Sequence, residues 1–286
     1  MLLQDLPQTE TGFLNLEMKL SEAYSYLGGI PGRELARALR SDEGLSVSYQ
    51  PQVSAADSQV IAVEALVRWS HPTVGPVSPR VFIPLAEETG LITQITDFVL
   101  KDACGVAKRH PDLKVAVNLS PTQFNCPVLV ERLAWIVDEC EATPSQIEFE
   151  ITENLPLGGN GSARESIASL RDAGFRIALD DYGVGYSGLK RLNHIGVDKL
   201  KIDQSFVRDL AEAKSMRPFT IVEEMIDLGR RMNLTVTAEG VETEEQRDFL
   251  SWAGCDALQG YLFARPMPVH ELEAFLSKQT CDAVAA

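Results

Sequence analysis

Residues 45–66, LSVSYQPQVSAADSQVIAVEAL, decide the fold because they place two strand-forming runs close together in the chain. The runs at 45–50 and 58–66 are apolar and rich in β-branched residues, which is typical of strands. Only PQVSAAD, residues 51–57, lies between them, whereas a parallel crossover needs about a dozen residues or more. We therefore expect the two strands to pair antiparallel, as a hairpin.

Six further runs of the same kind follow along the chain, at 113–119, 146–152, 175–181, 197–203, 234–240 and 257–261. Segments with helical spacing lie between most of the strands, at 84–109, 127–141, 162–173, 186–195, 217–233 and 243–253, with one more at 268–278. Gly174 and Gly254 stand where two of these helices should stop. Strands that alternate with helices in this number predict an α/β fold, a closed TIM-like (β/α)8 barrel. The hairpin makes it a modified barrel with one antiparallel strand.

The N-terminal segment differs from this pattern. FLNLEMKLSEAYSYL, residues 13–27, has helical periodicity, the breaker GGIPG follows, and RELARALR at 33–40 is typical of a second short helix. We predict an N-terminal helical arm or linker over 1–34 and the barrel domain over 35–286. The sequence leaves open whether the arm packs on the barrel, links it to an upstream domain or forms a dimer contact.

The composition excludes several classes of partner. Of 286 residues, 45% are hydrophobic and 23% charged, as in soluble globular proteins. The formal charge of −15 disfavours a DNA or RNA duplex and an anionic membrane as partners. No apolar run approaches the roughly 20 residues of a membrane span, and the N-terminus lacks the pattern of a signal peptide, so no membrane insertion is expected. The 5 scattered cysteines form no C-x-x-C pair, which indicates reduced thiols and a cytoplasmic location.

Polar side chains recur at or near the C-terminal ends of the predicted strands. They are Glu64, Asn118, Glu150, Asp180, Asp181, Lys201, Glu239 and Gln259. A single carboxylate at a strand end is usually a helix cap or a solvated loop residue, but here they recur strand after strand. In a barrel these strand ends converge on one face, where the active sites of this fold lie.

Several acids that face one another at one end of a barrel repel each other. Either cations compensate their charges, or their pKa values rise and some of them are protonated. Carboxylate and amide oxygens are ligands that suit Mg²⁺ or Mn²⁺. The chain has 4 histidines and no H-E-x-x-H motif, which disfavours a histidine-rich zinc site.

IALDDYGVGYSGL, residues 177–189, contains a G-x-G-x-x-G motif, which also occurs in dinucleotide-binding folds. In those folds the glycines follow the first strand directly, so that backbone N–H groups receive pyrophosphate. Here Asp180 and Asp181 occupy that approach, and the strand is the fifth of the series. We therefore interpret the glycines as part of a loop that covers a metal site.

The motifs also stand in an order that points to a family. They are YQP at 49–51, EAL at 64–66 within VEALVRW, NLS at 118–120, EITE at 150–153, DDYGVGYSGL at 180–189, KIDQSFV at 201–207, AEGVE at 238–242 and QGYLFARP at 259–266. Over residues 35–278 the chain resembles the EAL-domain cyclic-di-GMP phosphodiesterases. The family fold is a TIM-like barrel with one antiparallel strand, which agrees with the hairpin inferred from loop length.

The resemblance implies metal-dependent hydrolysis of one phosphodiester bond in cyclic di-GMP, giving linear pGpG. A first Mg²⁺ or Mn²⁺ would be held by Glu64, Asn118, Glu150 and Asp180. A second ion would be held by Asp180, Asp181 and Glu239. Lys201 would position or deprotonate the attacking water, with an ion pair to a neighbouring acid as the alternative role. Gln259 would orient water or ligand groups near the metal pair.

The resemblance also assigns residues to the substrate. Gln50, Leu66 and Arg68 would contact cyclic di-GMP, and Glu242 would support that part of the site. The guanidinium of Arg68 can grip a phosphate oxygen with its planar fork of donors.

The resemblance also implies a role for the loop after the fifth strand. Glu153 would tether residues 182–188 so that the second ion can bind. Val184 and Gly188 stand where the family usually has threonine and serine. Val184 removes a hydroxyl that could hydrogen-bond within the loop, which would reduce second-metal affinity and turnover.

Two other functions stay open beside the active phosphodiesterase. One is a binding module that senses cyclic di-GMP, turns it over negligibly and acts through a partner. The other is an unrelated metal-dependent barrel enzyme that acts on another phosphate ester. The resemblance also implies a homodimer and allows an upstream regulatory domain.

Overall fold

The computed structural model describes residues 32–41, 43–153, 155, 162–184, 192, 195–213 and 215–285. These fall into two compact units. The larger holds Val47–Val67 and the described residues from Thr93 onward, and the smaller holds the described residues up to Ser46 together with Arg68–Ile92. Most of the predicted N-terminal arm lies outside the described residues.

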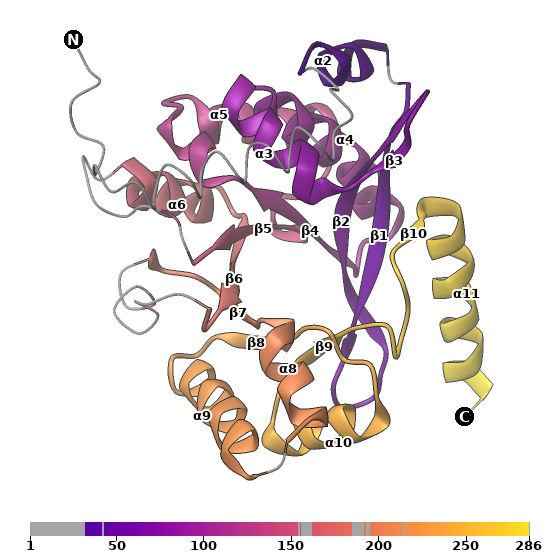
Figure 1. Ribbon diagram of the computed structural model, residues 1–286, viewed down its shortest axis with the longest axis vertical. Coiled ribbons are helices and arrows are strands. Elements are labelled where there is room, and N and C mark those ends of the chain that lie inside the picture. The colour runs from indigo at the N-terminus through magenta and orange to yellow at the C-terminus, as the bar shows by residue number, and fades with distance from the viewer. Residues whose placement is uncertain are drawn as a thin grey trace. The chain divides into compact units, whose positions relative to one another are not determined.

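Eight strands of one sheet close into a barrel, and Figure 1 labels them. They are β1 (Leu45–Ser54), β2 (Val60–His71), β4 (Lys114–Leu119), β5 (Ile147–Thr152), β6 (Arg176–Tyr182), β7 (Lys199–Ile202), β8 (Thr235–Ala238) and β9 (Ala257–Gln259). Neighbours run β1-β9-β8-β7-β6-β5-β4-β2, and β2 pairs with β1 to close the circle. The pairs from β2–β4 to β8–β9 are parallel, whereas β1 is antiparallel to β9.

The predicted modified barrel and its hairpin are therefore confirmed. The turn between β1 and β2 is closed by the amide of Ser54, which donates to the carbonyl of Gln59 at 2.8 Å. One short strand, β10 (Met267–Pro268), extends the sheet by pairing antiparallel with β1.

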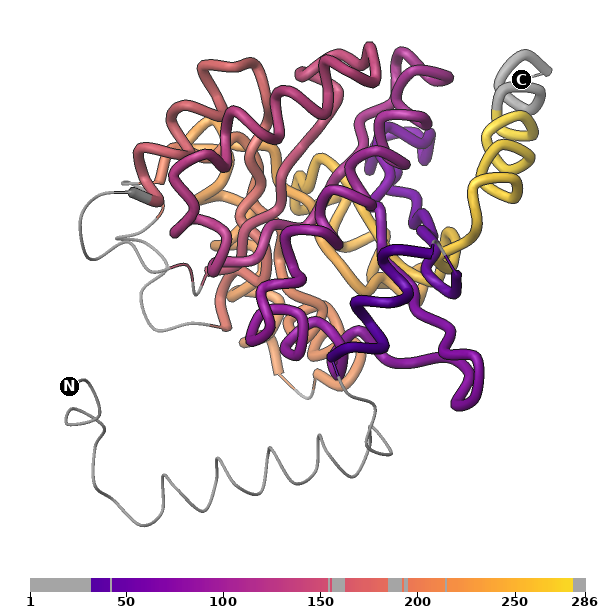
Figure 2. The backbone as a smooth tube through the Cα atoms, turned by 90° about the horizontal axis from the view of Figure 1, so that it is seen from above, coloured from indigo at the N-terminus to yellow at the C-terminus, as the bar shows by residue number. Residues whose placement is uncertain are grey.

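Helices follow the strands along the chain, and the tube of Figure 2 shows this succession from magenta through orange to yellow. They are α4 (Ile92–Arg109), α5 (Leu129–Glu139), α6 (Ser162–Asp172), α8 (Gln204–Ala211), α9 (Arg217–Arg231), α10 (Glu244–Ala253) and α11 (Val269–Ala285). Two short 3-10 helices, η1 (Pro121–Asn125) and η2 (Pro144–Gln146), precede α5 and β5. Gly174 and Gly254 follow α6 and α10 with positive φ, as their predicted stop role requires.

Two helix predictions need correction. The single helix expected over 84–109 is two helices, α3 (Pro79–Thr89) and α4, because Gly90 ends α3 in the left-handed conformation with φ at 73°. The helix α8 was not predicted. Its N-cap is Asp203, whose carboxylate accepts the amide of Ser205 at 3.0 Å immediately after β7. The helix expected over 186–195 lies almost entirely outside the described residues.

Two layers of side chains fill the barrel interior. We call the first the upper layer: Gln50, Glu64, Asn118, Glu150, Asp180, Lys201, Glu239 and Gln259. Residues two positions away along a strand share its face, so the lower layer consists of Gln52, Ala62, Ala116, Glu148, Ala178, Lys199, Thr237 and Ala257. Every lower-layer side chain is buried. The alternate residues, such as Phe149, Ile177 and Leu200, are fully buried on the opposite face of the strands.

The smaller unit is built around the end of β2. It contains α2 (Gly32–Ser41), α3 and the short strand β3 (Gly75–Val77), which pairs antiparallel with β2. The buried ring of Trp69 makes edge contacts with Phe82 and His71, each at 5.7 Å between ring centroids. The Nε2 atom of His71 lies 2.7 Å from the carboxylate of Glu34, and its Nδ1 atom accepts the amide of Thr73. These contacts anchor α2.

A close approach of α9 to β8 gives a first testable prediction. A Cβ added at Gly229 would lie 2.4 Å from the Cγ2 atom of buried Val236. Overpacking of this kind costs about 1–3 kcal/mol, so Gly229→Ala should lower the free energy of unfolding by about that amount. Gly105→Ala in α4 is the matched control, since its Cβ would meet only Arg109 at an ordinary 3.5 Å. Urea unfolding of both variants checks the prediction, and equal stabilities would contradict it.

Among the described residues no helix is both long and apolar enough to span a bilayer. Cys104, Cys126, Cys140 and Cys255 are free thiols.

Candidate active site

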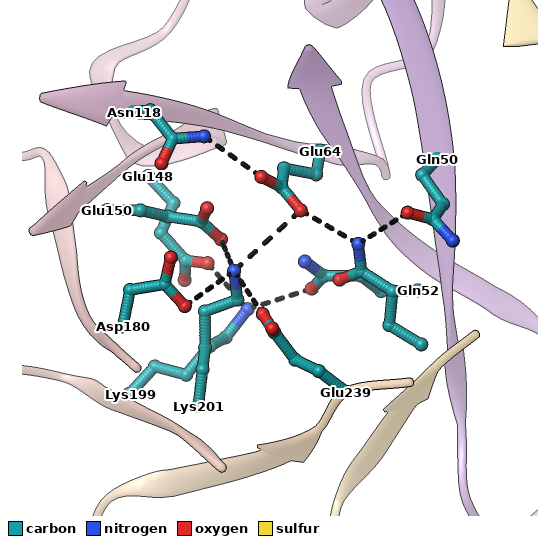
Figure 3. A network of polar contacts seen from close by, with 11 residues as sticks. Gln50, Gln52, Glu64, Asn118, Glu148, Glu150, Asp180, Lys199, Lys201 and Glu239 are labelled. Atoms are coloured by element: carbon teal, nitrogen blue, oxygen red, sulfur yellow. Dashed lines mark hydrogen bonds and ion pairs between the residues drawn. The ribbon is translucent and has the colours of Figure 1, made fainter. Parts of the chain in front are cut away.

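The upper layer surrounds one buried lysine. The Nζ atom of Lys201, on β7, lies 2.8 Å from Glu150, 3.1 Å from Asp180, 2.6 Å from Glu239 and 3.8 Å from Glu64. Figure 3 shows these side chains converging on the ammonium from different strands. Lys201 is 1% exposed, so its charge is balanced by protein groups and not by bulk water.

Three amide side chains complete this layer. Asn118 Nδ2 donates to Glu64 Oε1 at 2.9 Å, and Gln259 Nε2 donates to Glu64 Oε2 at 2.8 Å. Gln259 also donates to Gln50 Oε1 at 3.2 Å, and Gln50 in turn donates to the carbonyl of Ala264. The carboxylate of Glu64 is thus oriented from both sides by amides that the sequence had placed at strand ends.

The charges of Lys201 and Glu64 stabilise each other. Burial alone would lower the pKa of Lys201, but the carboxylates, with Asp180 first, raise it well above its ordinary value. Burial would likewise raise the pKa of Glu64, yet Lys201 and the hydrogen bonds from Gln259 hold it below its ordinary value. Lys201 is therefore an ammonium and Glu64 a carboxylate at neutral pH.

The remaining acids carry more negative charge than one lysine can balance. Burial and the neighbouring Glu64 raise the pKa of Glu150 well above its ordinary value. Burial, opposed by Lys201, raises the pKa of Glu239 to about 8. Burial and the charge of Asp180 raise the pKa of Asp181 to about 6. The cluster therefore holds protons at neutral pH that a cation could replace.

Glu153, the predicted loop tether, contacts Gly183 at the start of the loop. The amide of Gly183 donates to Glu153 Oε2 at 3.2 Å, and the amide of Glu153 donates to the carbonyl of Asp180 at 3.2 Å. Glu153 is buried, and Gly183 has a φ of +103°, which favours glycine. Val184 is 64% exposed. Gly188 and the rest of the 182–188 loop beyond Val184 lie outside the described residues.

The structure brings the predicted substrate residues together only in part. Gln50 belongs to the upper layer, and Leu66 follows Glu64 by two residues on the same face of β2. Arg68 lies in the smaller unit and stays a prediction. Glu242 is exposed after β8, where its amide donates to Gln246 Oε1 at 2.8 Å.

The polar members of the lower layer were not predicted from the strand ends. Lys199 Nζ lies 2.6 Å from Glu148 and donates to Gln52 at 3.2 Å, and all three side chains are buried. The signal was available, because Glu148 and Lys199 precede Glu150 and Lys201 by two residues. The two-residue period of a strand places them on the same interior face.

The donor set of the upper layer fits a hard divalent cation. Glu150 Oε2 is buried and accepts no hydrogen bond, and the excess of carboxylates over ammonium calls for further positive charge. Carboxylate and amide oxygens are the ligands that Mg²⁺ and Mn²⁺ prefer. Within the described residues, however, no three histidine, cysteine or acidic side chains are arranged so that they could hold a metal ion. The carboxylates close on Lys201 instead.

Comparison with known proteins agrees with this geometry. The EAL domain family matches residues 32–266 of the chain. MucR of Pseudomonas aeruginosa, a bifunctional diguanylate cyclase/cyclic di-GMP phosphodiesterase, is 40% identical over 84% of this chain and 36% of its own length. The cyclic di-GMP phosphodiesterase NbdA of the same organism is 38% identical over 87% of this chain and 32% of its own length. The chain thus spans about a third of the curated relatives it matches.

A solved structure resembles the described fold. The complex of the MucR phosphodiesterase with c-di-GMP matches with a TM-score of 0.76 and 39% identity, over 83% of this chain and 97% of that one. The family match covers most of the chain. The chain belongs to the EAL domain family.

Proposed function

We propose that the chain is a metal-dependent phosphodiesterase that hydrolyses cyclic di-GMP to linear pGpG. The observation that carries the proposal is the upper layer, in which three carboxylates from three strands and one from the residue after β8 surround the buried ammonium of Lys201. Membership of the EAL domain family and the similarity to two named cyclic di-GMP phosphodiesterases support the choice of substrate.

The upper layer supplies the proposed ligands. Glu64, Asn118, Glu150 and Asp180 would hold a first Mg²⁺ or Mn²⁺. Asp180, Asp181 and Glu239 would hold a second. Bound ions would offset the negative charge of the phosphodiester and acidify water near it.

In this proposal Lys201 would orient or deprotonate the attacking water. Its raised pKa keeps it protonated while the carboxylates face it, so its Nζ atom acts as a hydrogen-bond donor. A protonated Lys201 orients water and stabilises developing negative charge. It could accept a proton only after other cations had offset the carboxylates.

The amide residues and the loop have supporting roles in this proposal. Gln259 already fixes Glu64 and would orient water or substrate groups beside it. Gln50, Leu66 and Arg68 would contact the substrate, with Glu242 supporting the site. Glu153 would hold the loop through Gly183 and so keep Asp181 in place.

A receptor function is the second candidate, and Val184 is the observation that favours it. This apolar side chain is 64% exposed in the loop that the resemblance places over the second ion. A loop that closes poorly would leave binding intact and slow turnover. The chain would then sense cyclic di-GMP and act through a partner.

The test is to incubate the purified chain with cyclic di-GMP and Mg²⁺ or Mn²⁺ and to separate the products by chromatography. We expect pGpG from the wild type, none after chelation with EDTA, and none from Glu64→Ala. Glu165→Ala, at an exposed position of α6, is the matched control and should retain activity. Binding without product would favour the receptor function, and neither binding nor product would overturn the proposal.

Three expectations accompany this function as proposals, namely a cytoplasmic location, a homodimer and regulation by an upstream domain. The shares of MucR and NbdA that lie outside the matched region are consistent with additional domains in those proteins.

A further inference from the structure

The lower layer contains an ion pair that is buried beneath the upper layer. Lys199 is 5% exposed and Glu148 is 3% exposed, with their charged atoms 2.6 Å apart. Gln52 is fully buried and accepts a hydrogen bond from the same ammonium. Figure 3 shows this trio beside the upper layer, with no polar contact joining the two layers among the contacts drawn.

Small neighbours make room for this pair. The lower layer also holds four alanines, at positions 62, 116, 178 and 257, all buried. Ala178 stands on β6, between the strands that carry Glu148 and Lys199, and it pairs in register with Lys199. TIM barrels usually fill such layers with bulky branched side chains. Here the alanine on β6 leaves space for Lys199 to cross from β7 to β5.

The two layers repeat one arrangement. On β7 Lys199 and Lys201 are two residues apart, and on β5 the same spacing separates Glu148 and Glu150. Each lysine contacts the glutamate of its own layer, at 2.6 Å below and 2.8 Å above. The step between layers is about 6.5 Å along a strand, which the flexible lysine stem can span. The lysine of one layer could therefore pair with the glutamate of the other layer, in competition with the pairs that the structure shows.

A buried ion pair of this kind is weak evidence for stability, because apolar side chains of the same volume often serve as well or better. An unpaired charge in its place would be strongly disfavoured and would seek the nearest opposite charge. An uncompensated Glu148 would compete for Lys201 from below. An uncompensated Lys199 would compete for Glu150, one of the proposed metal ligands.

We propose that Lys199 and Glu148 are positioning residues, which neutralise each other so that Lys201 and Glu150 stay in the upper layer. This inference rests on the proposed function for its consequences in catalysis, but its consequence for cation binding stands without it. The pair acts through Lys201 and Glu150 and makes no contact with substrate.

A double-mutant cycle tests the proposal. The variants are Lys199→Met, Glu148→Gln and the combination of the two, with Lys108→Met as the matched control in an exposed ion pair with Glu141. For each protein we would measure the Kd for Mn²⁺ from the electron paramagnetic resonance signal of the free ion. We would also measure kcat and KM for cyclic di-GMP, and Tm.

Each single variant should weaken Mn²⁺ binding and lower kcat by at least about tenfold, because breaking one partner of a buried pair leaves the other charge uncompensated. The KM should stay within about threefold of wild type. The double variant should recover to within about fivefold of wild type in both Kd and kcat, and Lys108→Met should match wild type. This strong non-additivity is the sign of a pair that acts as a unit.

A purely structural role gives a different pattern and would overturn the proposal. In that case Tm falls, while the folded single variants keep the wild-type Kd and kcat. If Lys199→Met does not fold, Glu148→Gln compared with the double variant decides the same question. If the wild type forms no pGpG, the proposed function fails, and the cycle in Mn²⁺ affinity still decides between the two roles.

Discussion

Replacing Lys201 by methionine is expected to lower kcat for cyclic di-GMP hydrolysis by about 10³-fold, within the range for loss of a proton-transferring or charge-stabilising side chain. Methionine keeps much of the side-chain volume but removes the ammonium that touches Glu150, Asp180 and Glu239. The attacking water would lose its donor at Nζ, and the pKa values of Glu150 and Glu239 should rise further. Steady-state kinetics at saturating Mn²⁺ measures the loss.

The same variant should show a second effect, on stability. Removing one partner from a buried charge cluster costs about 3–5 kcal/mol, because the other charges are left uncompensated. Without added ions Lys201→Met should therefore unfold at a lower temperature than wild type. Saturating Mn²⁺ should restore most of the difference, since a ligand that binds only the folded state stabilises it.

Lys108→Met is the control for Lys201→Met, because it removes an ammonium from an exposed pair, and such pairs contribute little. It should keep wild-type kcat and Tm. A folded Lys201→Met protein with kcat within tenfold of wild type would remove Lys201 from the reaction. It would leave the lysine with the alternative role of an ion pair among the acids.

The barrel was predictable from the sequence because two simple rules applied without conflict. The turn between β1 and β2 is too short for a crossover, and the remaining strands alternate with helices. The two rules failed to predict helix boundaries that are set by single residues. Gly90 divides one expected helix into α3 and α4, and Asp203 starts α8 inside a stretch that looked like the end of a strand.

The upper layer was predictable because polar residues at strand ends are unusual when they recur around a barrel. The central position of Lys201 was not, since which carboxylates reach it depends on the tilt and register of β5, β6 and β8. Predicting the lower layer would have required a further inference, from each site residue to the residue two positions before it. Glu148 and Lys199 lie in strands whose apolar neighbours make them look like ordinary buried runs.

Binding of Mn²⁺ should depend steeply on pH, and this is the second large effect expected. The pKa of Glu239 is raised to about 8 by burial, so below pH 8 its carboxyl group is mostly protonated and cannot bind an ion. A ligand with this pKa loses about tenfold in apparent affinity for each pH unit below 8. The Kd should therefore be about 50-fold higher at pH 6 than at pH 8. The raised pKa of Glu150 adds to the effect in the same direction.

Affinity for Mn²⁺ is a better measure of this effect than turnover, because the concentration of hydroxide also changes the rate. Titration calorimetry at pH 6, 7 and 8, repeated in two buffers with different enthalpies of ionisation, gives both the Kd and the number of protons released. We expect proton release near pH 7 that fades above pH 8, where Glu239 is already ionised. In Glu239→Gln the part of the pH dependence due to this carboxyl should disappear, whereas Glu165→Ala should keep the full dependence. A Kd that does not change between pH 6 and pH 8 would contradict this prediction. It would mean that Mn²⁺ binds without displacing protons from the acids around Lys201.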